Sequence, residues 1–170
     1  MEEYVGCKVR QKEENELIMY QDNLLLKLQK HFGNEIMDVR KCEVPAGTGD
    51  RVVRSKEGLI STDRQSEYRS GVGMLLFLVK YSRPDIANSV RELSRLNDGA
   101  TENHMQMLLR VIKYVQLMKN KVLHFKVEKR TDKKPTLRGF SDSDWAGDKN
   151  DRRSVTGYCI YFMDCLVAWK

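Results

Sequence analysis

The sequence has 170 residues, of which 41% are hydrophobic and 32% charged, and its formal net charge is +6. This length allows one domain or two small ones with a core, and the mildly basic charge is compatible with nucleic acid without proving it. The longest apolar run, residues 74–79, is far too short to span a bilayer, and the acidic N-terminus lacks an apolar signal core. The cysteines form no CxxC pair and have no His at zinc-finger spacing. We therefore expect an intracellular protein with reduced thiols, in the cytoplasm or nucleus, and no membrane partner.

A β-hairpin and a helix are predicted near the N-terminus. Residues 4–9 alternate between apolar and polar side chains, residues 12–15 form a polar turn, and residues 17–20 resume as a strand. Asp22 is placed to cap the following helix, and Gly33 fits its C-terminal cap. Residues 42–59, with one Pro and several Gly, are predicted to form a loop.

The helix predicted after this loop begins with a capping-box pattern. Thr62 and Gln65 have the Thr-x-x-Gln spacing, and apolar residues at helical spacing continue to about Tyr81. Gly71 and Gly73 each cost such a helix roughly 1 kcal/mol relative to Ala. We therefore expect both glycines to allow the close approach of another element.

Two more amphipathic helices follow in the prediction. Pro84 fits the first turn of one, which ends at residues 97–99, and Thr101 caps the other. Short connections join these helices, so a packed helical subdomain is expected.

Basic residues surround a strand predicted over residues 123–127. They fit either phosphate contacts or a solvated linker between two domains, and both interpretations stay open. Few aromatic residues lie among them, so stacking on bases is weakly supported. These basic residues are Lys113, Lys119, Lys121, Lys126, Lys129, Arg130, Lys133 and Lys134.

The C-terminal segment is predicted to form strands around an acidic loop. The strands cover residues 136–141, 155–163 and 166–169, with a turn at residues 164–165 before the last. Asp142, Asp144 and Asp148 follow the first strand. Carboxylates at a strand end can hold Mg²⁺, which prefers hard oxygen ligands, although an acidic polar turn would have the same spacing.

Three motifs in this order resemble one family. Residues 142–148 (DSDWAGD) with 152–158 (RRSVTGY) resemble the start of the RNase H domain in Ty1/copia-type retrotransposon Pol polyproteins. Residues 68–78 (YRSGVGMLLFL) and 82–87 (SRPDIA) resemble the segment that joins the reverse transcriptase of that polyprotein to its RNase H domain. Together they cover nearly the whole chain.

The resemblance implies an α+β fold and a division into parts. Residues 1–128 would be the C-terminal part of a reverse transcriptase, with a palm-type β-hairpin and a three-helix thumb and connection region that grips the template–primer duplex. Residues 129–135 would be a basic linker, and residues 136–170 the first three antiparallel strands of an incomplete RNase H-like sheet. By the same resemblance Asp142 is the first catalytic, Mg²⁺-binding Asp, and the partner is an RNA–DNA hybrid or a DNA duplex.

The family copies element RNA into DNA, but residues 1–170 match only part of that machinery. They contain no Tyr-Val-Asp-Asp motif, and Asp144 and Asp148 match loop residues that are not metal ligands. RNase H chemistry uses two metal ions held by several carboxylates. We expect the chain to be inactive without further polyprotein segments, to bind Mg²⁺ weakly, and to expose an apolar face and an open edge. The alternatives are a non-catalytic nucleic-acid-binding remnant and a decayed element product without function.

Overall fold

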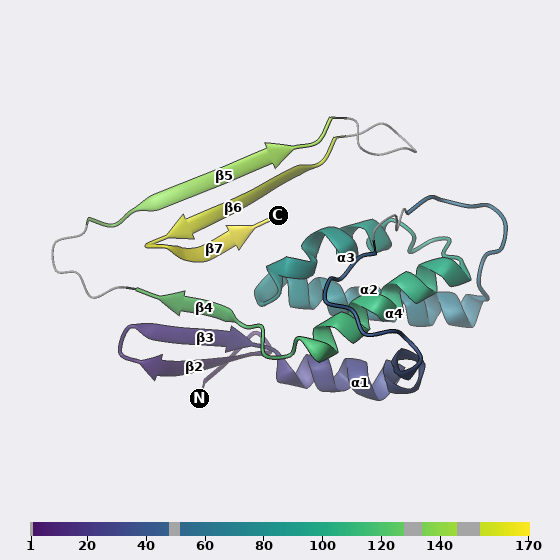
Figure 1. The fold of residues 1–170 in the computed structure, drawn as a ribbon, viewed down its shortest axis with the longest axis horizontal. Coiled ribbons are helices and arrows are strands. Elements are labelled where there is room, and N and C mark those ends of the chain that lie inside the picture. The colour runs from purple at the N-terminus through teal and green to yellow at the C-terminus, as the bar shows by residue number, and fades with distance from the viewer. Residues whose placement is uncertain (1, 48–51, 128–133, 146–153) are drawn as a thin grey trace. The chain divides into compact units, whose positions relative to one another are not determined.

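The computed structural model describes residues 2–47, 52–127, 134–145 and 154–170. The chain divides into two compact units, one formed by Gln21–Lys121 and the other by Met1–Tyr20 with Val122–Lys170. The first unit is helical and the second holds the sheets, so the predicted α+β class is confirmed (Figure 1). In the described ranges no helix combines the length and the apolar character needed to cross a membrane.

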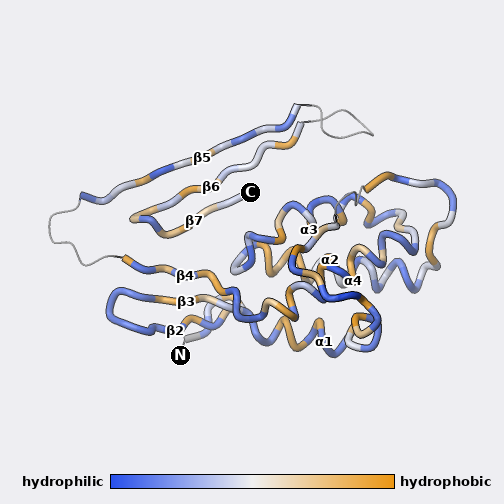
Figure 2. The backbone as a smooth tube through the Cα atoms, in the orientation of Figure 1, coloured by the Kyte–Doolittle hydropathy of each residue, from blue (hydrophilic) through white to orange (hydrophobic). Residues whose placement is uncertain are grey.

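The helical unit packs four α-helices around one core. They are α1 (Asp22–Met37), α2 (Thr62–Tyr81), α3 (Ala87–Ser94) and α4 (Glu102–Leu117), and the 3-10 turn η1 (Pro84–Ile86) precedes α3. Figure 2 shows hydrophobic and hydrophilic segments alternating along each helix, as expected where one face is buried. The fully buried side chains include Leu28, Phe32, Tyr68, Leu75, Leu108 and Ile112.

The helix boundaries confirm some cap predictions and correct others. Thr101 caps α4 as predicted: in its capping box, the backbone N–H of Thr101 donates to Nδ1 of His104 at 3.1 Å. The cap of α2 is Ser61, one residue before the expected Thr62, because the Ser61 hydroxyl accepts from the backbone N–H of Arg64 at 3.3 Å.

The prediction for the ends of α1 was wrong at both caps. Asp22 is already helical and follows the cap residue Gln21, whose side chain makes no capping hydrogen bond. Gly33 lies inside the helix, which continues to Met37 because Ile36 adds another buried side chain to the stripe formed by Leu28 and Phe32.

Gly71 and Gly73 differ, although the sequence predicts the same role for both. A Cβ on Gly71 would lie 2.9 Å from Cδ2 of Leu108 and 3.0 Å from Cζ of Phe32, so close helix packing requires glycine there. A Cβ on Gly73 would meet nothing within 4 Å, which contradicts the prediction for that position.

The first sheet has the strand order β1-β2-β3-β4 and is antiparallel throughout. Its strands are β1 (Glu2–Tyr4), β2 (Cys7–Glu13), β3 (Glu16–Tyr20) and β4 (Leu123–Lys126). The single strand predicted over residues 4–9 is wrong, because Val5 and Gly6 have φ of 48° and 69° and turn the chain between β1 and β2. The predicted strand at 123–127 is confirmed as β4.

The second sheet has the order β5-β6-β7, formed by β5 (Leu137–Ser143), β6 (Thr156–Phe162) and β7 (Cys165–Trp169). All the pairings are antiparallel, as predicted. The turn between β6 and β7 lies one residue earlier than expected, since Met163 and Asp164 have positive φ and Cys165 begins β7.

Candidate functional site

Asp142 lies within β5, directly opposite Gly157 of β6, and its side chain is exposed. One of its carboxylate oxygens, Oδ1, accepts a hydrogen bond from the backbone N–H of Ser143 at 2.9 Å. The strand extends to Ser143, so Asp142 is the penultimate residue of β5 and does not follow the strand as the sequence had indicated.

Asp144 extends the ladder between β5 and β6. Its backbone N–H donates to the carbonyl of Val155 at 3.1 Å, and its Oδ1 accepts from the backbone N–H of Val155 at 2.5 Å. This carboxylate therefore serves to close the strand end. Asp148 lies outside the described residues.

The described donor set does not fit a two-ion metal centre. Within the described ranges no three His, Cys, Asp or Glu side chains come together in a way that could hold a metal ion. Two divalent ions a few ångströms apart require carboxylates from several elements. Asp142 supplies one carboxylate, so no catalytic step through a metal follows from these residues.

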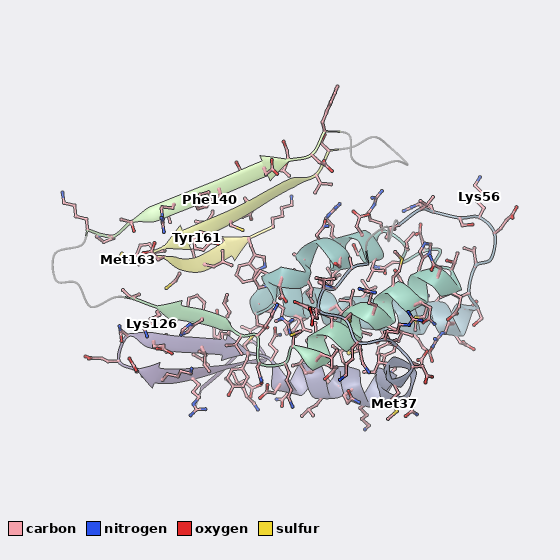
Figure 3. All side chains as sticks on the ribbon, viewed as in Figure 1. Met37, Lys56, Lys126, Phe140, Tyr161 and Met163 are labelled. Carbon is pink, nitrogen blue, oxygen red and sulfur yellow. The ribbon has the colours of Figure 1, made fainter. Side chains whose placement is uncertain are left out.

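Several of the predicted phosphate-binding lysines are held by intramolecular contacts. Lys113 donates to the carbonyl of Ile36 at 2.8 Å near the end of α1. Lys126, labelled in Figure 3, pairs with the nearly buried carboxylate of Glu16 at 3.2 Å, and this hydrogen bond raises the pKa of Lys126. Lys121 donates to the hydroxyl of Tyr114 at 2.9 Å, which raises its own pKa.

The other five basic residues predicted to contact phosphate fall into two groups, those that the structure describes and those that it does not. Lys119 and Lys134 form no ion pair with any residue in the described ranges, and both are exposed. Lys129, Arg130 and Lys133 lie outside the described residues. The partners of Lys113 and Lys126 come from elements distant in sequence, so no local sequence signal could have identified them.

The SRPD motif forms the polar junction of the helical unit. The guanidinium of Arg83, with a side chain only 4% exposed, binds both carboxylate oxygens of Asp85 at 2.8 Å. Arg83 also donates to the carbonyl of Met118 at 3.3 Å, and the hydroxyl of Tyr114 donates to Asp85 at 2.9 Å. Burial by itself would raise the pKa of Asp85, but the bonds from Arg83 and Tyr114 lower it overall. The motif thus ties η1 to α4.

Tyr68 and Gln65 anchor the end of α3 to α2. The buried hydroxyl of Tyr68 donates to the carbonyl of Leu93 at 2.8 Å. Gln65 donates to the carbonyl of Asn97 at 3.1 Å and accepts from the backbone N–H of Ala100 at 2.8 Å. Tyr68 and Gly71, which belong to the YRSGVG motif, are therefore packing residues, as are Arg83 and Asp85 of the SRPD motif.

An exposed strip on α2 was missed by the sequence reasoning. Arg69, Gly73, Phe77 and Lys80 are exposed and recur at helical spacing. The rings of Phe77 and Tyr81 lie 4.9 Å apart. Reading exposed positions at intervals of three to four residues, rather than only apolar ones, would have found this strip.

Comparison with known proteins places the chain among transposon proteins. It is 36% identical over 105 residues, 62% of the chain, to the retrovirus-related Pol polyprotein from transposon RE1 of Arabidopsis thaliana. It is 31% identical over 103 residues to the corresponding polyprotein from transposon TNT 1-94 of Nicotiana tabacum, and it spans 7% of each polyprotein. It is also 38% identical over 103 residues to the secreted RxLR effector protein 161 of Plasmopara viticola, covering 70% of that protein. No family model and no solved structure matches.

The fold and site define an α+β chain whose upstream motif residues are packing residues and whose strand β5 carries one metal-ligand candidate, Asp142. The comparisons say which proteins share its sequence. Over about 62% of its length the chain is homologous, at 31–36% identity, to retrovirus-related Pol polyproteins from copia-type transposons.

Proposed function

We propose that residues 1–170 are the section of a retrotransposon Pol polyprotein that joins its reverse transcriptase to its RNase H domain. In this proposal the helical unit is the thumb and connection region, and β5, β6 and β7 open the RNase H-like sheet. The similarity to the RE1 and TNT 1-94 Pol polyproteins is the observation that carries the proposal. Asp142 is then the first ligand of an Mg²⁺ centre whose other ligands come from other parts of the polyprotein.

By this proposal residues 1–170 have no nuclease activity alone. A lone exposed carboxylate holds a dication weakly, and two-ion hydrolysis of a phosphodiester needs both ions in place. The purified chain should leave the RNA strand of a labelled RNA–DNA hybrid intact in Mg²⁺. Cleavage that disappears on Asp142→Asn would refute this part of the proposal.

A chimaera tests the positive part. The matching segment of the RE1 Pol polyprotein is replaced by residues 1–170, and RNase H cleavage and DNA synthesis are measured. Cleavage should be retained and then abolished by Asp142→Asn, while DNA synthesis persists. Asp144→Asn is the matched control, and it should keep cleavage because that carboxylate bonds the backbone of Val155. A chimaera equally active with Asp142→Asn would remove Asp142 from the metal centre.

The α2 strip is the surface of the helical unit that we assign to the nucleic-acid duplex. Arg69 and Lys80 supply positive charge, Phe77 supplies an exposed ring, and the open space over Gly73 leaves room for a sugar–phosphate backbone. Arg69, Phe77 and Lys80 are exposed and do not belong to the core of the helical unit. They are therefore available to contact a duplex without disturbing the packing of α2.

Salt-dependent binding tests this surface. The affinity of residues 1–170 for an RNA–DNA duplex should fall steeply with added salt, because each phosphate contact releases counterions. Removing both charges with Arg69→Ala and Lys80→Ala should flatten the plot of log affinity against log salt by roughly one unit or more. Lys56→Ala removes a charge from an exposed loop residue, labelled in Figure 3, and should change the slope little. Equal slopes in all these proteins would contradict the assignment.

A second candidate function is nucleic-acid binding without catalysis, performed by these residues alone. The observation that favours it is the exposed pair of cations on α2, Arg69 and Lys80, which needs no catalytic residue to bind phosphate. The similarity to RxLR effector protein 161, of which this chain covers 70%, shows a comparable segment in a shorter protein. The chimaera distinguishes the two candidate functions. A segment that only binds nucleic acid would support neither DNA synthesis nor RNA cleavage in the chimaera.

A further inference from the structure

The helical unit is inserted between two strands that pair with each other. β3 ends at Tyr20, β4 begins at Leu123, and their antiparallel pairing places Met19 opposite Leu123 (Figure 1). Every residue of the helical unit lies between these strands in the sequence. Paired strands are about 4.8 Å apart, so the points at which the chain enters and leaves the helical unit have to lie close together.

The closeness of these two points has to be maintained by specific contacts. A turn of a few residues closes an ordinary hairpin, whereas residues 21–122 separate β3 from β4. A long segment loses entropy when its two ends are brought together. The contacts that offset this loss are expected near Gln21, where the chain enters the helical unit, and near Lys121, where it leaves.

Ser82 holds the entry. Its hydroxyl donates to Oε1 of Gln21 at 2.6 Å, and both residues are buried. Gln21 is the N-cap residue of α1, but its side chain makes no capping hydrogen bond. Its Nε2 is buried without a hydrogen-bond partner in the described ranges, and an unpaired buried amide destabilises a fold. Packing and capping therefore do not account for a glutamine at this position, whereas the bond from Ser82 does.

Arg83 holds the exit. Its guanidinium donates to the carbonyl of Met118, directly after α4, at 3.3 Å and lies over the ring of Tyr114, 5.6 Å from the ring centroid. Lys121, the last residue of the helical unit, donates to the hydroxyl of Tyr114 at 2.9 Å. Asp85 accepts from both Arg83 and Tyr114, so the exit is fixed by a connected set of side chains.

We propose that Ser82 and Arg83 together hold both ends of the helical unit and thereby keep β3 and β4 paired. The two residues are adjacent and directly follow α2, where Pro84 disfavours the helical conformation at Arg83. They are positioning residues of the first sheet, although they belong to the helical unit. This role goes beyond the function proposed above and does not depend on the strip of α2.

Hydrogen exchange followed by mass spectrometry on the 170-residue chain tests the entry. Ser82→Ala should speed exchange in peptides covering β3 and β4 by roughly threefold to tenfold, because a buried hydrogen bond is lost. Peptides from the middle of α4, residues 104–112, should change by less than about twofold. A role in overall stability alone would raise exchange in both regions by the same factor.

Two further variants show whether the bond itself is responsible. Gln21→Met should reproduce the effect of Ser82→Ala, and the two changes together should have no greater effect than either alone, because they remove the same bond. Ser94→Ala is the matched control. The Ser94 hydroxyl donates to the carbonyl of Arg91 at 2.7 Å, a bond that joins neither end of the helical unit, so exchange in β3 and β4 should stay unchanged.

The exit is tested by Arg83→Leu combined with Asp85→Ala, which leaves no unpaired charge buried. Exchange in residues 117–126 should rise roughly tenfold relative to residues 104–112, since several hydrogen bonds are lost there. Unchanged exchange in β3 and β4 with both Ser82→Ala and Gln21→Met, an equal rise in residues 104–112, or an equal rise with Ser94→Ala would each overturn the proposal. No nucleic acid is present in these measurements, so their outcome is independent of the nuclease, chimaera and binding experiments.

Discussion

Removing the carboxylate of Asp85 should cost more stability than removing any exposed acid. Arg83 is nearly fully buried, and in Asp85→Ala its guanidinium would lose both bonds to a carboxylate while keeping only the carbonyl of Met118 and the face of Tyr114. Breaking a buried pair by removing one partner costs about 3–5 kcal/mol. The Asp85 side chain is 29% exposed, so water can partly replace it, and we expect about 3 kcal/mol.

Urea unfolding followed by circular dichroism measures this cost. Asp98→Ala is the control, because the pair of Asp98 with Arg54 is well exposed and should contribute less than about 1 kcal/mol. Replacing both members of the buried pair, with Arg83→Leu and Asp85→Ala together, should recover part of the loss because no unpaired charge remains buried. The reasoning fails if Asp85→Ala lowers the free energy of unfolding no more than Asp98→Ala does.

Two further tests concern residues of the helical unit. Gly71→Ala should destabilise the protein by about 1–3 kcal/mol, because the added methyl group would press against Leu108. Gly73→Ala should stabilise it by up to about 1 kcal/mol, because a methyl group there meets nothing. Thermal unfolding measures both, and equal changes in Tm for the two variants would contradict the packing. Burial lowers the pKa of His104, whose Nδ1 accepts from the N–H of Thr101, so the unfolded chain binds a proton at a higher pH than the folded one. Stability should therefore fall as the pH drops below about 6.5, and His104→Gln, which keeps a capping-box residue, should flatten that fall in denaturation measured between pH 7.5 and 5.5.

Periodicity predicted the elements well where local physics decides them. The stripe containing Tyr68, Val72 and Leu75 identified α2, and Thr101 identified the start of α4, because helix faces and caps depend on residues within one or two turns. Positions that oppose local preference were missed. Val5 adopts a left-handed φ, which β-branched residues rarely do, so it masked the turn between β1 and β2 although Gly6 beside it is a turn residue.

The candidate site was less predictable because it depends on partners distant in sequence. Lys113 and Lys126 were grouped by charge, yet one binds the end of α1 and the other binds Glu16 on the neighbouring strand. Basic residues that follow one another in the sequence therefore occupy different environments in the fold, and their charge alone does not predict a common binding surface. Asp142 was identified by resemblance to the family, and its exposed position on β5 is a property that only the fold shows.

The motifs upstream of β5, which carry part of the resemblance to the family, consist of residues that take no part in the candidate site. Tyr68, Gly71, Arg83 and Asp85 belong to the motifs upstream of β5, and each of them packs or bonds within the helical unit. A chain can keep all of these contacts, and so remain recognisable and folded, without assembling a metal centre. The described carboxylates of the DSDWAGD motif have separate tasks, since Asp144 closes a strand end and Asp142 stands alone. Similarity in the upstream motifs therefore reports the helical scaffold, and activity has to be tested at Asp142.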